Sequence, residues 1–329
     1  MGTLILTDSP DQLSEFFPAT PAWRQADQSS LEAPLANLWS AIGPSTSVWT
    51  SAAPDSFDVG AWDAVAIIDQ APGSQFDALH EATSKNTPLP SAVACLALRG
   101  RGFHGNRNRA WSVEKGNLHL TTLHACDAPV SKVRLGFSML PTVAAARAIA
   151  GQAGKPGQIG IKWVNDILIE GQKVAGAITS TQVENDAYRA VIMGLGMNVE
   201  RTPPIETSNF VPAAGCLADL LPVSSLTLTD VLPKVLRAFD DAYRNLVSEG
   251  QGDLLEAYRR FSCCIGENVT VWAENVSDFA STEPLAQGKL LSINDDLSLN
   301  IEGRQEPVGR GRLAFTDKSW PMGTARIAD

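Results

Sequence analysis

The sequence has few of the features that mark membrane-spanning, secreted or metal-binding chains. It contains no run of about 18 or more apolar residues, so we expect no membrane-spanning helix and no membrane partner. Its start, MGTLILTDSPDQLSEFF, has neither the basic flank nor the long apolar stretch of a secretory signal. The five cysteines are scattered without a CxxC pair, which argues against a disulfide framework and against a zinc site. We therefore expect a cytoplasmic chain that holds no metal ion of its own.

Positive charge is also scarce. Lys and Arg total 26 against 36 Asp and Glu, which gives a formal net charge of −10. Because non-specific nucleic-acid binding needs a cationic surface that releases counterions, we expect no nucleic-acid partner. The 44% of hydrophobic residues is ordinary for a globular protein with a sizeable core. An anionic small substrate would need a local basic pocket in this acidic chain.

The first part of the chain is difficult to interpret. The 329 residues are enough for one large domain with a smaller one, or for two of moderate size. Residues 1–55 form an N-terminal extension of unclear role, in which we expect a short helix, a loop and a second helix around LEAPLANLWSAI. We find no helix-turn-helix pair with a basic recognition helix, so this extension gives no support for DNA binding.

From about residue 60 the pattern becomes mixed α and β. Apolar and alternating runs predict strands at WDAVAIID, SAVACLAL and GNLHLTTLHA. Helices are predicted at SQFDALHEAT, at SMLPTVAAARAIAGQ, over 228–248 and at GDLLEAYRRF. A meander consists of the strand QIGIKW, the hairpin DILIEGQKVAGAITST and the strand AYRAVIMGLGMNV. Its short turns predict antiparallel pairing.

The last part of the chain has a different character. After Phe261 the strands become short and polar turns separate them, which predicts a small β barrel or sandwich of about 65 residues. The predicted fold class is therefore α+β, with a mixed, largely antiparallel sheet flanked by helices. The predicted domains are the extension over 1–55, a central domain over 56–260 and a small β domain over 261–329.

Lys162 is the first candidate for chemistry. In the segment GIKWVNDILIEGQKVAG it follows Ile161 in a predicted strand whose other face is apolar. Either Lys162 points to water on an exposed face of the sheet, or it meets an anion. We expect no lowered pKa for this lysine, because nothing nearby in the sequence indicates one, and a role as nucleophile is therefore the weaker hypothesis.

Two glycine-rich segments are the other candidates. RGRGFHGNRNRAW, residues 99–111, places four arginines and His104 among glycines, whose backbone N–H groups approach anions closely. In VIMGLGMNV, Gly194, Gly196 and Asn198 share one face of a strand, which gives a floor without side chains for a flat ligand. The plainer alternatives are a solvated loop and a crowded packing site. Together with Lys162, the segments suit the joining of an acid to a nucleotide.

These segments resemble the motifs of the biotin–protein ligases, within the biotin/lipoate protein ligase family. KWVNDILIEGQKVAGAITS is similar to the signature Lys-Trp-Pro-Asn-Asp, an apolar strand, a Gly-Lys turn and a Val-Ala-Gly-Ile strand. VIMGLGMNV resembles Gly-Ile-Gly-Ile-Asn-Val, and GRGFHGNRNRAW resembles the loop Gly-Arg-Gly-Arg-Arg-Gly-Arg-x-Trp. The resemblance covers roughly residues 60–315. It implies a class II synthetase-like catalytic fold with a C-terminal SH3-like barrel.

The resemblance also implies an activity. Members of the family use Mg²⁺ and ATP to convert biotin to biotinyl-5'-adenylate, and then transfer biotin to a lysine of a carboxyl carrier domain. A homodimer formed through sheet edges is possible, because relatives pair in this way. Such chemistry depends on charge stabilisation and orientation more than on a strong base.

Residue roles follow from the same resemblance. Lys162 would contact the biotin carboxylate and the α-phosphate, and Arg101 would hold the phosphate and acyl junction with the backbone of Gly100 and Gly102. Trp111 would lie against adenine. The further residues assigned to substrate or nucleotide binding are Asn198 at the adenine edge, Gly176 and Ala177 in the biotin pocket, and His104, Gly105, Arg109, Asn165, Asp166, Gly194 and Gly196.

The sequence departs from the family pattern mainly where the acid would bind. Val164 replaces the signature proline, at a position we expect on a strand. Two loop arginines of the family align with Phe103 and His104, so that Arg107 or Arg109 would take over. The further departures are DQAPGSQFD in place of a Ser-Thr-Asn segment, with Ser74 and Gln75 loosely in register, and Ala97 in place of a glutamine. The alternatives are a lipoate- or octanoate-type ligase or acyltransferase of this fold, and a non-catalytic binding protein.

Overall fold

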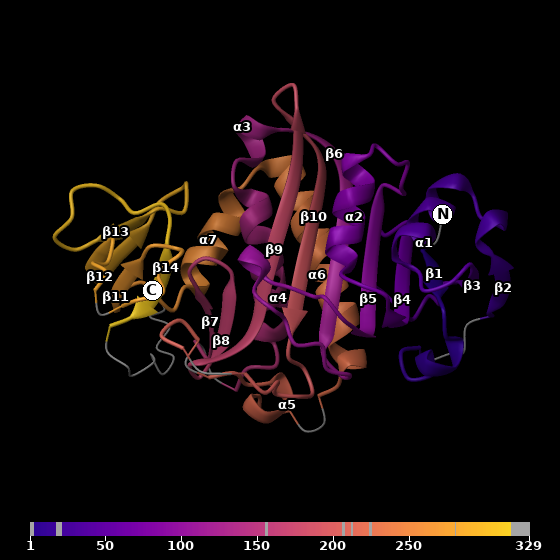
Figure 1. Cartoon of the computed structure of the whole chain (residues 1–329), viewed down its shortest axis with the longest axis horizontal. Coiled ribbons are helices and arrows are strands. Elements are labelled where there is room, and N and C mark those ends of the chain that lie inside the picture. The colour runs from indigo at the N-terminus through magenta and orange to yellow at the C-terminus, as the bar shows by residue number, and fades with distance from the viewer. Residues whose placement is uncertain are drawn as a thin grey trace.

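The computed structural model describes residues 3–17, 22–154, 157–205, 208–211, 213–223, 226–279 and 281–316. These residues form a ten-stranded sheet in the order β2-β3-β1-β4-β5-β6-β10-β9-β8-β7 and a four-stranded sheet in the order β13-β12-β11-β14. Figure 1 shows the large sheet running across the molecule from β2 to β7, with the small sheet beyond β7 and β8. The predicted fold class, a mixed and largely antiparallel sheet flanked by helices with a small C-terminal β unit, is confirmed.

The N-terminal residues add three strands to the large sheet, which the sequence did not predict. β1 (Leu4–Thr7) lies parallel to β4, and β3 (Ser47–Ala52) pairs antiparallel with both β1 and β2 (Arg24–Asp27). The second predicted helix is α1 (Ala33–Ile42). The short helices here are 3₁₀ turns, at Pro10–Leu13 and Gln28–Ser30. Strands of four residues are too short to show a clear hydrophobic period.

The middle of the large sheet contains the predicted strands in the expected antiparallel meander. Only β4 and β5 pair in parallel here, and helix α2 connects them. The strands are β4 (Ala64–Ala71), β5 (Ala92–Gly100), β6 (Leu118–Pro129), β7 (Ile159–Lys162), β8 (Asp166–Ile169), β9 (Gln172–Glu184) and β10 (Ala187–Met197). β10 lies between β6 and β9, antiparallel to both.

Helices cover both faces of this sheet. Because alternate residues of a strand face opposite sides, Val65 and Ile67 pack in one core with α4 and α6, whereas Ala66 and Ile68 pack in the other with α1 and α2. The remaining helices are α2 (Gln75–Ser84), α3 (Val130–Val133), α4 (Gly136–Ala150), α5 (Leu217–Leu220), α6 (Leu228–Glu249) and α7 (Gly252–Phe261). In the described part of the chain, no helix has the length and apolar character that crossing a membrane requires.

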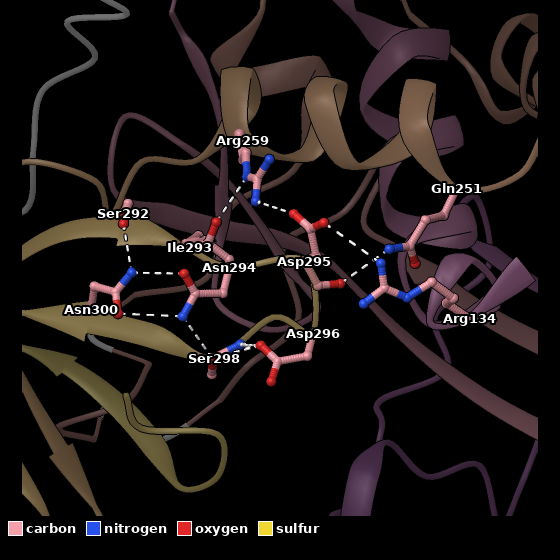
Figure 2. Close-up of polar contacts among 10 residues, drawn as sticks. All are labelled: Arg134, Gln251, Arg259, Ser292, Ile293, Asn294, Asp295, Asp296, Ser298 and Asn300. Atoms are coloured by element: carbon pink, nitrogen blue, oxygen red, sulfur yellow. Dashed lines mark hydrogen bonds and ion pairs between the residues drawn. The ribbon is translucent and has the colours of Figure 1, made fainter. Parts of the chain in front are cut away.

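The four-stranded sheet is attached to the helical layer by polar contacts. Its strands are β11 (Asn268–Trp272), β12 (Ala286–Ile293), β13 (Leu299–Ile301) and β14 (Arg312–Phe315), all antiparallel. Arg259 of α7 donates to the carbonyl of Ile293 at 2.8 Å and to Asp295 at 2.9 Å (Figure 2). Arg134 pairs with Asp295 at 3.5 Å, and Gln251 donates to its carbonyl at 3.1 Å. The bounds of the predicted domains stay predictions.

Candidate functional site

A cavity of about 270 Å³ opens on the face of the large sheet that carries the small residues of β9 and β10. Its lining comes from the start of α2, the segment 103–112, the strands β6, β9 and β10, and Arg312 of β14. Gly196 of β10 pairs directly with Gly176 of β9. The cavity therefore has the backbone floor that the sequence predicted.

Trp111 lies over that floor. A Cβ on Gly196 would collide with the Trp111 indole, so this glycine is needed for the close approach. The indole Nε1 donates to Nδ1 of His119 at 3.2 Å, and His119 Nε2 donates to the carbonyl of Glu114 at 3.2 Å. These contacts require a neutral imidazole, and burial lowers the pKa of His119 to about 4. Trp111 and His119 thus form a fixed wall.

Gly194 also lies in a crowded place. A Cβ there would meet Ile178 at 2.8 Å and Phe76 of α2 at 3.3 Å. The packing alternative therefore describes this glycine better than a bare floor does. Both Phe76 and Phe103 line the cavity, so that its end near α2 is aromatic.

Lys162 is buried, with 3% of its surface exposed. Its Nζ donates to the carbonyl of Phe210 at 2.6 Å, which excludes the hypothesis that it points to water. Burial lowers the pKa of Lys162, although Asp166 opposes the shift. This differs from the expectation of an ordinary pKa, because the sequence does not show that β7 lies under a covering segment. The side chain lines a second cavity, of about 450 Å³, that adjoins the first.

Val164 does not lie on a strand, contrary to the sequence-based expectation. β7 ends at Lys162 and β8 begins at Asp166, and these two residues pair across an antiparallel turn. Trp163, Val164 and Asn165 form the turn, so the two-residue alternation stops at Lys162. Asn165 stabilises this turn, because its Nδ2 donates to the carbonyl of Ala177 and its own carbonyl accepts from the amide of Ala177 at 3.1 Å.

Asp166 and Lys173 form an ion pair at 2.7 Å between the two cavities. Burial tends to raise the pKa of Asp166, but the charges of Lys173, Lys162 and Arg109 outweigh it, and the pKa is lowered. Lys173 Nζ also lies 5.8 Å from the centroid of a Trp111 ring. Sequence reasoning missed Lys173, although the Gly-Lys turn of the signature contains it.

Only some residues of the glycine-rich loop line the two cavities. Phe103, His104, Gly105, Arg109 and Trp111 line the first cavity, whereas Gly100, Arg101 and Gly102 line neither cavity. Arg101 and Gly102 are exposed.

Two basic side chains of this loop contact acidic side chains. His104 Nε2 lies 2.9 Å from both carboxylate oxygens of Asp77, and this hydrogen bond raises the pKa of His104. Arg107 pairs with Glu274 of the C-terminal unit.

Three further residues stand where the sequence departs from the family pattern on the acid side, and only one of them lines a cavity. Ser74 lines the cavity and caps α2 by accepting from the amide of Asp77 at 3.2 Å. Gln75 is buried and lies outside both linings, and Ala97 is buried in the core with α1 and α2. Of the two residues that are loosely in register with the family's segment, Ser74 lies in the cavity wall and Gln75 does not.

The two polar side-chain atoms of Asn198 differ: one is hydrogen-bonded within the described residues and the other is not. Its Nδ2 donates to the carbonyl of Gly215 at 2.9 Å, which fixes the amide. Its Oδ1 is buried and has no hydrogen-bond partner within the described residues. Asn198 lines the first cavity, so this acceptor is available to a ligand that carries an N–H group.

Arg312 is the functional candidate that the sequence missed altogether. It lies on β14, lines both cavities and stacks on Phe210 with 3.5 Å from its Cζ to the ring centroid. The run GRGR at 309–312 has no resemblance to the ligase motifs, and only the docking of the small sheet brings it to the site.

Known proteins show the same combination of motifs and fold. Residues 78–198, which contain the glycine-rich loop, Lys162 and most of the meander, match the model of the biotin/lipoate A/B protein ligase family. This part of the chain is therefore similar to that family. The bifunctional ligase/repressor BirA of Bacillus subtilis is 28% identical over 227 residues, which span 68% of this chain and 65% of that protein. The chain thus matches just under two thirds of this relative's length.

Two further known proteins are similar to the chain. The biotin–[acetyl-CoA-carboxylase] ligase of Mycobacterium tuberculosis is 28% identical over 64% of this chain and 73% of its own length. The biotin protein ligase from Aquifex aeolicus, solved in complex with biotin and ATP, has a similar fold, with a TM-score of 0.56 at 17% identity over 76% of this chain and 97% of that chain. The similarity of fold therefore extends well beyond the matched motifs.

Proposed function

We propose that the chain is an ATP-dependent biotin–[carboxyl carrier protein] ligase. In the first step a carboxylate oxygen of biotin attacks the α-phosphorus of ATP, which gives biotinyl-5'-adenylate and pyrophosphate. In the second step a lysine amine of a biotin carboxyl carrier domain attacks the acyl carbon, which gives an amide and releases AMP. The match of residues 78–198 to the family model supports this activity, and so do the biotin ligases among the relatives.

The single observation that carries the proposal is the position of Lys162. Its ammonium group is buried beside the place where the two cavities meet, within a few residues of the Asp166–Lys173 pair. A preorganised cation in a water-poor site stabilises charge that develops on a carboxyl–phosphate junction. Burial lowers its pKa, and a bound anion would oppose that shift and favour the charged form.

Adenine is proposed to bind at the Trp111 side of the first cavity. The buried Oδ1 of Asn198 would accept a hydrogen bond from the exocyclic amine, and the indole of Trp111 would lie against the base. Gly196 would supply the floor, and Gly194 would allow Ile178 and Phe76 to pack closely beside it. Arg109 lines both cavities, so we propose that it holds the α-phosphate in place of the exposed Arg101.

Biotin is proposed to bind against the backbone of Gly176 and Ala177. The aromatic side chains of Phe76 and Phe103 would cover its apolar part, and His104, held by Asp77, would lie at the polar end. Asn165 and Asp166 would keep the turn after Lys162 in place, since Asn165 bonds to Ala177. Orientation of the two substrates supplies much of the rate enhancement in such a reaction.

Magnesium and the remaining partners complete the proposal. No cluster of three or more His, Cys, Asp or Glu side chains that could hold a metal ion occurs in the described ranges. We propose that Mg²⁺ arrives on the phosphates of ATP, where it commonly keeps several waters. We also propose a cytoplasmic location, no nucleic-acid partner, and a homodimer formed through an exposed sheet edge.

Exchange of labelled pyrophosphate into ATP tests the proposed activity. The assay is run separately with biotin, lipoate and octanoate, and we expect exchange with biotin. Exchange with lipoate or octanoate alone would instead indicate an acyl ligase of the same fold. Absence of exchange with all three acids would favour a non-catalytic binding protein.

A further inference from the structure

Two neighbouring cysteines lie against the strand that carries Lys162. After α7 the chain runs beside β7, where Ser262 forms a parallel bridge with Ile161. The amide of Cys263 donates to the carbonyl of Ile161 at 3.0 Å. Cys263 and Cys264 therefore lie at the β7 edge of the large sheet, and they line neither cavity.

Gly160 makes room for Cys263. A Cβ on Gly160 would lie 2.6 Å from the Cβ of Cys263 and 3.1 Å from its Sγ, so a larger residue would displace this cysteine. Gly160 and Lys162 are alternate residues of β7 and share one face of the strand. Cys263 is also partly exposed. Its thiol thus lies on the lysine's face of β7, where a small solute can reach it.

Cys264 is buried and contacts the turn after Lys162. Its Sγ accepts a hydrogen bond from the amide of Trp163 at 3.5 Å. Tyr258 of α7 bonds to the same turn, because its hydroxyl donates to the carbonyl of Val164 at 2.9 Å. The turn therefore depends on Cys264 for one of its hydrogen bonds.

The two thiols favour different protonation states. A hydrogen bond with Cys264 raises the pKa of Cys263, and burial raises it further. Burial tends to raise the pKa of Cys264 as well, but the hydrogen bonds with Cys263 and with the amide of Trp163 oppose it. The charge of Lys162 acts in the same direction, and the pKa of Cys264 is lowered. Because the thiolate is the reactive form, Cys264 is the nucleophile of the pair.

The other three cysteines are adjacent to no other cysteine in the sequence. Cys95 is buried in the core with α1 and α2, and burial raises its pKa to about 12. Cys126 is partly exposed, and burial raises its pKa to about 11. Burial also raises the pKa of Cys216, which bonds to Asp219 at 3.1 Å. A reactive thiolate beside a second thiol is therefore a feature of residues 263–264.

We propose that Cys263 and Cys264 form a modification site, at which a hydroperoxide converts the two thiols to a reversible disulfide that disturbs the turn after Lys162. The Cys264 thiolate attacks one peroxide oxygen, which gives a sulfenic acid and releases hydroxide or alkoxide. The sulfur of Cys263 then attacks that of Cys264, and the hydroxyl group leaves as water with the proton of Cys263. The two sulfurs lose two electrons, and the peroxide oxygens gain them.

The disulfide is expected to be easily reduced. The Cα atoms of adjacent residues are about 3.8 Å apart, whereas disulfide partners are usually separated by at least about 4.4 Å. A bond between neighbours is therefore strained, and strained disulfides are the labile ones. Reversible oxidation of this kind is also the usual role of a disulfide in a cytosolic protein.

The consequence for activity rests on the proposed function. Burial lowers the pKa of Lys162, and the charge of the Cys264 thiolate is among those that oppose the shift. Disulfide formation removes this charge and moves the sulfur that accepts from the Trp163 amide. Both changes disfavour a fixed, charged ammonium group at Lys162. We therefore expect the oxidised chain to form biotinyl-5'-adenylate severalfold more slowly than the reduced chain.

Mass spectrometry of the full chain after treatment with hydrogen peroxide tests the site without any substrate. The remaining thiols are alkylated, and the tryptic peptide 261–289, which contains both cysteines, is analysed. We expect this peptide to lose two hydrogens and to take up no alkyl group. Treatment with dithiothreitol should restore two thiols that can be alkylated. Single-turnover formation of the adenylate, before and after oxidation, measures the consequence for activity.

Cys263→Ser is the test variant, because it removes the second thiol. We expect its Cys264 to be oxidised to a sulfinic acid, which dithiothreitol does not reverse. Cys126→Ser is the matched control, since it removes another partly exposed cysteine, and it should form the disulfide as the unaltered chain does.

Two alkylated cysteines in the peptide after peroxide treatment would overturn the modification site, and so would a reversible product of the same kind in Cys263→Ser. Equal rates of adenylate formation in the reduced chain and in the disulfide form would overturn the link to Lys162. If the reduced chain forms no adenylate, the proposed function fails, whereas the mass of the peptide still decides the thiol chemistry.

Discussion

Single residues shape the first cavity, and Gly196 shows how. It pairs with Gly176 across β9 and β10 and allows the Trp111 indole to lie against the sheet. The alternation in MGLGMN predicts which face these glycines occupy, because side chains along a strand alternate. It does not predict that Trp111 covers them, since that contact joins two distant segments.

Gly196→Ala is expected to displace Trp111. The added methyl group occupies the space of the indole, so we expect a loss of about 1–3 kcal/mol in the free energy of unfolding, as for overpacked cores. We also expect weaker ATP binding. Urea unfolding and ATP titration measure the two effects. Gly151→Ala is the control, because a Cβ at Gly151 meets nothing within 4 Å. Equal behaviour of both variants would contradict the assigned role of Gly196.

His119 is expected to make folding sensitive to acid. Its pKa is about 4 in the folded protein, against the ordinary histidine value of 6.5, because burial disfavours the imidazolium form. The unfolded chain binds the proton more readily, so stability is full above about pH 6.5 and falls as the pH approaches 4. Urea unfolding at several pH values should show His119→Leu gaining stability relative to the unaltered chain as the pH falls. A constant difference across this range would contradict a buried neutral His119.

At the scale of elements, hydrophobic period and turn chemistry account for most of the predicted fold. The apolar runs of β4, β5 and β10 and the amphipathic stripe of α6 are long enough to identify their elements. β2 is four residues of mostly polar and exposed sequence, so nothing local marks it as a strand. Its pairing with β3 and the place of both at the sheet edge depend on tertiary contacts.

In the candidate site, too, local motifs identified some residues, whereas tertiary contacts alone bring the others into place. Lys162, Trp111 and the glycines of β10 were identified because they belong to recognisable motifs. Arg312 and Glu274 could not be identified, because the docking of the C-terminal sheet brings them to the loop and to Lys162. The motif likewise did not indicate that Arg101 is exposed.

Substitution of Asp295 tests how the small C-terminal sheet docks on the helical layer of the large sheet. Its carboxylate accepts a hydrogen bond from Arg259 and forms an ion pair with Arg134 across the junction, whereas the neighbouring Asp296 accepts hydrogen bonds from Ser298 within its own turn (Figure 2). Because these pairs are exposed, we expect Asp295→Ala to lower the free energy of unfolding by less than about 1 kcal/mol. We expect a larger effect on the KM for ATP, since Arg312 lies on the docked sheet.

Steady-state kinetics of pyrophosphate exchange at varied ATP measures this effect. Asp296→Ala is the control, and we expect its KM to match that of the unaltered chain. A KM for ATP in Asp295→Ala that equals the control value would show that docking through Asp295 does not position the nucleotide site.

At the scale of the whole molecule, an acidic chain gathers cations at one place. The large sheet supplies Lys162 and Lys173, the glycine-rich loop supplies Arg109, and the small sheet supplies Arg312. Separate parts of the chain thus meet where the two cavities join. Under the proposed function, this arrangement would give a protein with a net charge of −10 a local site for a nucleotide and an acid.

The central claim is that the buried ammonium group of Lys162 stabilises the joining of biotin to the nucleotide. Single-turnover formation of biotinyl-5'-adenylate from ATP and biotin, detected by mass spectrometry, tests it most directly. We expect the unaltered chain to form the adenylate and Lys162→Met to form it at least about a hundredfold more slowly, as when a preorganised charge is removed. The exposed-site variant Lys115→Met should keep the original rate. An unchanged rate in Lys162→Met, with both proteins folded, would contradict the account.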